Sequence, residues 1–332
     1  MATPAIEDLQ TAARAGDVAA MTALGARLLA GRDAPLAPFD GAQLVVDAAS
    51  KGGAQAADIV SVLAGAGACT PQSWPLALDY LQLAAERGWP RARAQLALLA
   101  GDRELAHKSQ NGGLPNDAWR RLRESVDIAR WITPSRAQVI SHRPHLETFE
   151  SFLPPVICDW LIERARPNLK PAQVYDDAEE APRLANARTN SSAEFDIIGT
   201  DLIMVLLRSR IAAATGFGVG NLEYTSVLHY NVGEQFRRHF DFLDPNVPGP
   251  AADLARRGQR AATLLIYLNE GYESGETEFP LADIKYKGKK GGALHFKNVE
   301  ASGAPDRQTL HAGIAPTRGE KWLLSQWVRD RG

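Results

Sequence analysis

Hydrophobic residues follow two different patterns along the chain. Up to about residue 105, alanine and leucine recur at helical spacing, whereas after residue 145 the apolar residues fall into short runs separated by glycine, proline and acidic residues. Helical spacing predicts packed helices, and short punctuated runs predict the strands of a sandwich or barrel. We therefore predict a helical domain at residues 1–105, a linker helix within 106–140 and a β-rich domain at 141–332.

The first hundred residues contain an internal repeat. The pattern Ala-Ala-x-x-Gly begins at residues 12, 48 and 84, with a period of 36 residues. Small residues let two helices approach closely, and each glycine suits a helix end or a tight turn. A period of this length built from two helices is typical of a helical solenoid, although an alanine-rich bundle could show it by coincidence. The stretch resembles the Sel-one-like subclass of tetratricopeptide repeats.

Individual elements can also be predicted. Residues 102–116 are polar and rich in glycine, which predicts a break, and a helix follows at 118–132. Further helices are expected directly after Pro154-Pro155 and at 200–215. Short apolar runs predict strands at 223–231, 262–269, 292–296 and 321–329.

The candidate chemistry begins with His239 and Asp241. In a strand, residues two apart project from the same face, so this imidazole and carboxylate would lie together. Taken alone, the motif fits a surface ion pair better than a metal site. His311 changes that interpretation, because two histidines and one carboxylate form the facial triad that binds non-haem Fe(II) and leaves positions open for substrate and oxygen.

Lys321 begins the apolar run at 321–329. By the alternation of a strand it shares one face with Leu323, Ser325 and Trp327. A cation that enters a barrel interior is costly unless it meets an anion, and the distal carboxylate of 2-oxoglutarate would be such an anion. An ordinary surface lysine in front of a strand is the alternative.

These residues belong to a longer series of motifs. The series reads Leu228-His229-Tyr230-Asn231-x-Gly233-x-x-Phe236-x-x-His239-x-Asp241, then the strand 260–269, then Gly275-Glu276-Thr277-x-Phe279-Pro280, then 291–296, then Asp306-x-x-x-Leu310-His311-x-Gly313, and last Gly319-x-Lys321-Trp322 through Trp327; residues 187–192 agree upstream. In order, spacing and residue type the region resembles the prolyl 4-hydroxylase type of 2-oxoglutarate and Fe(II) dioxygenases.

The resemblance implies an α+β protein in which the helical repeats precede a double-stranded β-helix, a jelly-roll variant with supporting helices. It implies that His239, Asp241 and His311 are the catalytic iron ligands. The cofactors would be Fe(II), the cosubstrate 2-oxoglutarate and O₂, with ascorbate as an additional candidate.

The same resemblance assigns the cosubstrate site. Lys321 would pair with the distal carboxylate of 2-oxoglutarate, helped by the hydroxyls of Tyr230 and Thr277, because a lysine alone does not fix the orientation of an anion. Trp327 would line the pocket near the iron. Arg188 is a weaker candidate for substrate contact, since it lies outside the tightest motifs.

Several residues are given ordinary roles. We expect His229 to face outward and His295 to be a packed or surface histidine rather than a fourth ligand. The segment 244–258 is rich in proline and glycine, so it is either a loop that closes over the substrate or a plain connector.

Composition narrows the function class. The net charge of −2 gives no reason to expect nucleic-acid binding. The chain has two cysteines, no basic leader and no long apolar run, which favours free thiols, a cytoplasmic location and no membrane span. The oligomeric state stays open.

The leading hypothesis is a hydroxylase of a prolyl or other residue in a peptide or protein, held by the helical repeats. The alternatives are a hydroxylase of a free small molecule and a non-catalytic scaffold with a relic oxygenase fold.

Overall fold

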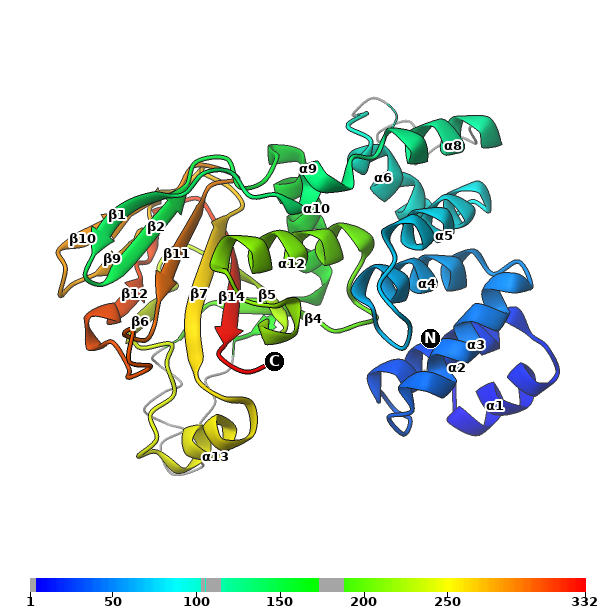
Figure 1. The fold of residues 1–332 in the computed structure, drawn as a ribbon, viewed down its shortest axis with the longest axis horizontal. Helices are drawn as coiled ribbons and strands as arrows, with labels where there is room; N and C mark the ends of the chain where they lie inside the picture. Colours follow the sequence, from blue (N-terminus) through cyan, green and yellow to red (C-terminus); the bar gives the residue numbers. More distant parts are fainter. Residues whose placement is uncertain (1–3, 103–104, 106–114, 173–187) are drawn as a thin grey trace. The chain divides into compact units, whose positions relative to one another are not determined.

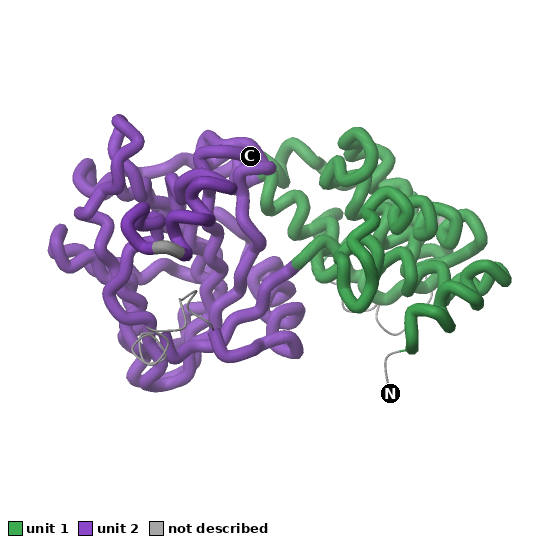
Figure 2. The backbone as a smooth tube through the Cα atoms, turned by 90° about the horizontal axis from the view of Figure 1, so that it is seen from below, with its two compact units in different colours: residues 1–132, 196–209 green, residues 133–195, 210–332 purple. Residues whose placement is uncertain are grey.

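The computed structural model describes residues 4–102, 105, 115–172 and 188–332. They form two compact units, shown in green and purple in Figure 2. The first unit comprises residues 1–132 and 196–209, and the second comprises 133–195 and 210–332. The predicted domain limits at 105 and 141 stay a prediction. Most of the predicted break at 102–116, and Ala187 of the matched series, lie outside the described residues.

The described residues of the first unit form a series of helices (Figure 1). Its helices are α1 (Ile6–Arg14), α2 (Val18–Ala30), α3 (Pro38–Ser50), α4 (Ala54–Ala66), α5 (Trp74–Glu86), α6 (Pro90–Leu99), α8 (Asn116–Ser125) and α9 (Ile128–Ile132), together with the first half of α12 (Leu202–Thr215).

The glycines of the 36-residue period adopt the same backbone conformation. Gly16, Gly52 and Gly88 have φ values of 89°, 102° and 89°, in the left-handed region that favours glycine. Each lies in the turn that joins two consecutive helices, α1 to α2, α3 to α4 and α5 to α6. The repeated glycine therefore sets a repeated turn.

A buried polar cluster holds the first unit together. The Asp58 side chain is fully buried and accepts hydrogen bonds from Trp89 Nε1 (3.0 Å), Arg91 Nε (2.7 Å) and Gln95 Nε2 (3.0 Å). The amide oxygen of Gln95 in turn accepts from the backbone N–H of Leu202 (2.8 Å), which starts α12. A helix start has unpaired N–H groups, so Gln95 supplies one of the partners that α12 needs.

The helix predicted at 118–132 is two helices instead of one. α8 ends at Ser125 because Val126 is extended (φ −72°, ψ 116°). The Asp127 carboxylate then accepts from the N–H of Arg130 (3.1 Å) and begins α9. A local side-chain hydrogen bond here outweighs the continuous helical pattern of the sequence.

The second unit is rich in β-strands, as predicted, and these strands pair antiparallel. Its strands are β1 (Gln138–His142), β2 (His145–Phe149), β3 (Lys170–Pro171), β4 (Ser191–Phe195), β5 (Thr225–Tyr230), β6 (Phe236–His239), β7 (Arg260–Tyr267), β8 (Glu273–Ser274), β9 (Thr277–Phe279), β10 (Ile284–Tyr286), β11 (Ala293–Lys297), β12 (His311–Gly313), β13 (Pro316–Arg318) and β14 (Lys321–Arg329). Its helices are α10 (Pro155–Ala165), the second half of α12, α13 (Pro248–Arg257) and the short 3₁₀ helices η1 (Arg166–Asn168), η2 (Val219–Asn221) and η3 (Arg307–Thr309).

The strands form one large and one small sheet that face each other (Figure 1). The large sheet has the order β1-β2-β11-β7-β14-β5-β4-β3, and the small one has the order β10-β9-β12-β6. β13 and β8 form a separate pair. Side chains of both sheets meet in one buried cluster: Leu146, Leu228, Tyr230, Leu265, Tyr267, Phe279, Leu294, Phe296 and Leu323. The core of this unit therefore lies between the sheets.

Two further observations bear on the sequence predictions. Cys69 and Cys158 are both free thiols. Within the described ranges, no helix combines the length and the apolar character needed to cross a membrane. The cytoplasmic location stays a prediction.

Substitution of Asp58 by alanine tests the buried cluster. We expect a loss of about 3 kcal/mol in the free energy of unfolding, because the change leaves Arg91 and Gln95 without their buried acceptor. Asp58→Asn keeps an acceptor and should lose less. Urea unfolding followed by helical circular dichroism measures both, and a loss below about 1 kcal/mol for Asp58→Ala would contradict this account.

Candidate metal centre

The strand register brings the two histidines together. β6 and β12 pair antiparallel with His239 directly opposite His311, and the two imidazole ring centroids are 4.2 Å apart. Asp241 follows β6 by two residues and is buried. The candidate ligand atoms of these residues all lie within 4.8 Å of one another. The structure thus places all three predicted metal ligands in one cluster.

Both imidazoles are oriented by backbone carbonyls. Nδ1 of His239 lies 2.7 Å from the carbonyl oxygen of Arg237, and Nδ1 of His311 lies 2.9 Å from that of Thr309. A carbonyl oxygen can only accept, so each Nδ1 carries a proton and each Nε2 is the ring nitrogen available to a metal ion. These Nε2 atoms lie 3.5 Å and 3.6 Å from the oxygens of Asp241. This arrangement is typical of metal-binding histidines.

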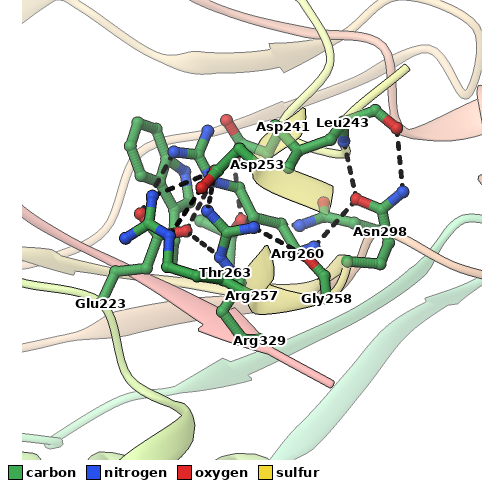
Figure 3. A network of polar contacts seen from close by, with 12 residues as sticks. Glu223, Asp241, Leu243, Asp253, Arg257, Gly258, Arg260, Thr263, Asn298 and Arg329 are labelled. Carbon is green, nitrogen blue, oxygen red and sulfur yellow. Dashed lines mark hydrogen bonds and ion pairs between the residues drawn. The ribbon is translucent and has the colours of Figure 1, made fainter. Parts of the chain in front are cut away.

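The Asp241 carboxylate is oriented by a chain of hydrogen bonds (Figure 3). The Thr263 hydroxyl donates to Oδ2 of Asp241 (2.7 Å) and accepts from Nδ2 of Asn298 (2.9 Å). Thr263 and Asn298 are completely buried. Because the single hydroxyl proton goes to the carboxylate, Asn298 must present its NH₂ group, which fixes the amide orientation.

The protonation states suit a divalent cation. Burial, and then the nearby His239, lower the pKa of His311 to about 4, so this imidazole is neutral at pH 7. Burial alone would raise the pKa of Asp241, but His311, His239 and the Thr263 hydroxyl together hold it well below its usual range. Two imidazoles and one carboxylate are the side chains of the facial triad of non-haem Fe(II).

Lys321 is completely buried in the core. It stands directly opposite Tyr230 in the pairing of β14 with β5, and its Nζ lies 5.0 Å from the centroid of the Tyr230 ring. Among the residues that the structure describes, no hydrogen-bond partner reaches Nζ. Burial lowers the pKa of Lys321 to about 7, even though Glu276 acts to raise it. An anion bound beside this amine would offset the cost of burying its charge.

The two predicted hydroxyl groups are buried in the same unit. Thr277, on β9, bonds through its hydroxyl to the Tyr267 hydroxyl (2.8 Å). Tyr230, on β5, is 2% exposed, and burial raises the pKa of its hydroxyl to about 12. Tyr230 therefore stays neutral and able to donate at any physiological pH.

Trp327 and Arg188 each connect to the candidate metal ligands through one intermediate residue. Trp327 pairs across β14 and β7 with Thr263, which bonds Asp241. The guanidinium of Arg188 lies 4.7 Å from the centroid of the Phe236 ring, and this ring stacks on His239 at 3.5 Å. The structure thus brings both residues near the candidate metal ligands, including Arg188, which was the weaker candidate from sequence.

An ion network supports the strand ends beside Trp327 (Figure 3). Arg260 stacks 3.5 Å above the Trp327 ring and pairs with Glu223 (2.7 Å). Arg329 pairs with Glu223 (2.5 Å) and with Asp253 of α13 (2.5 Å). The network fixes the Trp327 ring and ties α13 to the sheet.

Sequence reasoning did not find Thr263, Asn298 or Arg260. A signal existed for Thr263, because it is a hydroxyl residue within the apolar run 262–269. No comparable signal existed for Asn298, whose role depends on contact with a strand that is distant in sequence. Arg260 was part of the matched series, but the stacking on Trp327 could not be foreseen.

Three predictions about other residues are refined by the structure. His229 lies on the opposite face of β5 from Tyr230, as expected. It is not exposed to solvent, however, because it is only 7% exposed and bonds to Glu320 (2.8 Å). His295 is a packed histidine, 3.2 Å from Glu147. The segment 244–258 contains the helix α13.

Comparison with known proteins places the chain in a family. Residues 225–329 match the 2OG-Fe(II) oxygenase superfamily. Prolyl 4-hydroxylase 2 of Arabidopsis thaliana is 33% identical over 218 residues, which cover 59% of this chain and 71% of that protein. The chain belongs to the prolyl 4-hydroxylase type of the 2OG-Fe(II) oxygenases. This oxygenase is an oxidoreductase, and its family implies Fe(II), 2-oxoglutarate and O₂ as cofactors.

Two other relatives extend the comparison. Prolyl 4-hydroxylase subunit alpha-1 of Rattus norvegicus is 30% identical to this oxygenase over 202 residues, which cover 60% of the chain and 37% of that subunit. The solved structure of a viral collagen prolyl hydroxylase from Paramecium Bursaria Chlorella virus-1 is 27% identical, with a TM-score of 0.42, and covers 55% of this chain and 94% of the viral one.

The buried lysine of this oxygenase should reduce the stability of the ligand-free protein. Lys321 loses its proton in the folded state near pH 7 but keeps it in the unfolded state up to 10.5. The unfolded state therefore binds more protons, so the free energy of unfolding rises with pH in this window. Lys321→Met removes the penalty and should stabilise the ligand-free protein by about 1–3 kcal/mol at pH 7.5.

The stabilising effect of Lys321→Met should shrink toward pH 10, by up to about 1.4 kcal/mol per pH unit. Urea unfolding at several pH values measures the difference between the two proteins. Lys285→Met, at a side chain that is 63% exposed, is the control and should change stability by less than about 0.5 kcal/mol. A wild-type protein more stable than Lys321→Met at pH 7.5 would contradict the assignment of a buried, unpartnered amine.

Proposed function

We propose that this oxygenase is a 2-oxoglutarate- and Fe(II)-dependent hydroxylase that acts on a prolyl or another residue of a peptide or protein. The observation that carries the proposal is the His239, Asp241 and His311 cluster together with the buried amine of Lys321, for which the described residues offer no hydrogen-bond partner. A facial triad alone fits several metals and reactions. An additional buried cation fits a cosubstrate that brings its own anion.

Each residue of the site would have a distinct task. His239, Asp241 and His311 would hold Fe(II), and Lys321 would pair with the distal carboxylate of 2-oxoglutarate beside the hydroxyls of Tyr230 and Thr277. When bound, Fe(II) with 2-oxoglutarate and O₂ supplies the oxidation in which one oxygen atom enters a C–H bond and the other enters succinate, with loss of CO₂. The surrounding apolar core would exclude water from this reaction.

The proposal extends to the fold of both units. The facing sheets of the second unit would form a double-stranded β-helix of the jelly-roll type, with the metal cluster between its sheets. The helix pairs of the first unit, with their equivalent glycine turns, would be Sel-one-like repeats. Ascorbate stays an additional candidate reductant, and the oligomeric state stays open.

The preference for a peptide substrate has two supports. The relatives are named prolyl 4-hydroxylases. In addition, the first unit has a hollow of about 180 Å³ lined by Ala49, Ser50, Asp79, Tyr80, Leu83 and Arg87. A hollow with an aromatic ring and both charges suits an extended polypeptide, because its backbone needs polar partners and its side chains need apolar ones.

Turnover with and without Fe(II), and with one candidate iron ligand removed, tests the proposed reaction. The purified protein should release succinate from 2-oxoglutarate only with Fe(II) present, and products from lysate peptides should gain the mass of one oxygen atom. His239→Ala removes one iron ligand and should abolish turnover. Full activity of His239→Ala would refute the ligand assignment, and oxygen gain confined to free metabolites would favour a small-molecule substrate.

Tyr80→Ala tests whether the first unit holds the substrate. If the hollow binds the polypeptide, the KM for a peptide substrate should rise about fivefold to tenfold, as for a lost aromatic contact, with the KM for 2-oxoglutarate unchanged. Phe39→Ala is the matched control, because Phe39 is 74% exposed in the same unit and does not line the hollow. Equal KM values for both variants and the wild type would assign the first unit to another task.

A further inference from the structure

Strand β7 is flanked at both ends by a side-chain amide. Gln259 directly precedes the strand, and Asn269 follows it by two residues. Each amide has one NH₂ donor group and one carbonyl acceptor, the same groups as a peptide bond. Both side chains use them to bind the backbone of a segment that carries a functional residue.

Gln259 binds the segment that leaves the metal cluster. The N–H of Leu243 donates to Oε1 of Gln259 (2.7 Å), and Nε2 of Gln259 donates to the carbonyl oxygen of Leu243 (2.9 Å), as drawn at Leu243 in Figure 3. Both bonds are buried. Leu243 follows Asp241 by two residues, so these bonds fix the backbone directly after the carboxylate ligand.

Asn269 binds the segment that carries the buried lysine. Its Nδ2 donates to the carbonyl oxygen of Glu320 (2.8 Å), and its Oδ1 accepts from the N–H of Trp322 (2.8 Å). These two backbone groups flank Lys321 on either side. The Glu320 side chain is itself bonded to His229 (2.8 Å).

The position of Asn269 coincides with the end of strand pairing. On the β7 side, the register with β14 ends at Tyr267 and Leu323, and the N–H of Leu268 donates one more bond to the carbonyl oxygen of Trp322 (3.0 Å). On its other side, Lys321 pairs with Tyr230 of β5. Asn269 therefore supplies the backbone bonds on the β7 side of Lys321, and without them this edge of β14 would move more freely. The amine has no hydrogen-bond partner among the described residues to hold its side chain, so the backbone must position it.

We propose that Gln259 and Asn269 are positioning residues with separate tasks, Gln259 for the metal ligand Asp241 and Asn269 for the cosubstrate lysine Lys321. This inference rests on the proposed function, because it takes the triad as the metal site and Lys321 as the 2-oxoglutarate site. Both residues act through backbone groups of other segments and do not touch the reacting atoms.

Direct binding measurements on Gln259→Leu and Asn269→Leu test the proposal. Calorimetry first gives the Kd of Mn(II) for the ligand-free protein and then the Kd of 2-oxoglutarate for the protein saturated with Mn(II). Gln259→Leu should weaken Mn(II) binding by about tenfold or more, as for other residues that orient metal ligands, and leave 2-oxoglutarate binding within about threefold. Asn269→Leu should show the reverse, with a loss of about tenfold for 2-oxoglutarate.

Each variant is the control for the other, because each removes an amide that flanks β7 and makes two bonds to the backbone of another segment. Equal weakening of both ligands in both variants would show a general loss of structure and overturn the proposal. Unchanged binding would overturn it as well. A wild-type protein that binds neither Mn(II) nor 2-oxoglutarate would instead overturn the proposed function.

Conservative variants keep the test decisive if a leucine variant does not fold. Gln259→Glu and Asn269→Asp keep the size and the acceptor oxygen of each side chain but remove the donor to the carbonyl oxygens of Leu243 and Glu320. The same division between Mn(II) and 2-oxoglutarate is expected, because each carboxylate oxygen would face a carbonyl oxygen and could not bond it. The KM for 2-oxoglutarate should rise in Asn269→Asp more than kcat falls, and the absence of both divisions would overturn the proposal.

Discussion

The core of the second unit contains the buried amine of Lys321, and none of the described residues forms a hydrogen bond with it. Lys321 is completely buried, and its pKa falls to about 7 because burial disfavours the charged form. A sequence selected for stability alone would place an apolar residue here. An anion bound beside the amine would offset this cost, so the proposed function predicts that ligand binding stabilises this unit.

The pairing register of the strands determines where the candidate metal ligands and the Lys321 amine lie. His239 meets His311 through the pairing of β6 with β12, and Lys321 meets Tyr230 through that of β14 with β5. Because side chains alternate along a strand, a slip of one residue would turn either group to the opposite face. β7 connects the two places, since Thr263 bonds Asp241 and Tyr267 bonds Thr277. The candidate site residues come from many strands, and the central strand β7 contacts three of them, Asp241, Thr277 and Trp327.

Much of this site could be predicted from sequence, for an identifiable reason. His239 and Asp241 are two residues apart and Lys321 follows His311 closely, so local spacing and the family motif carried the information. Contacts between distant segments carried no such signal, and Asn298 and Gln259 were therefore missed. The break at Val126 was missed because a single Asp127 hydrogen bond decides it. Helical and strand patterns report burial of a face, and they do not report which polar side chain meets which backbone group.

The segment 244–258 illustrates what the polar contacts add. From sequence it was either a closing loop or a connector. In the structure its two ends are joined by Gln259, and its helix α13 is tied to β14 by Asp253, whose carboxylate accepts from Arg257 (2.6 Å) and Arg329 (2.5 Å). Opening such a segment would break charge-assisted bonds and expose the buried amide pair. A segment that moved during turnover would be held by fewer and weaker contacts. The contacts therefore favour a segment 244–258 that stays fixed next to Asp241. The ion network that ties α13 to β14 also holds the Trp327 ring, through Arg260.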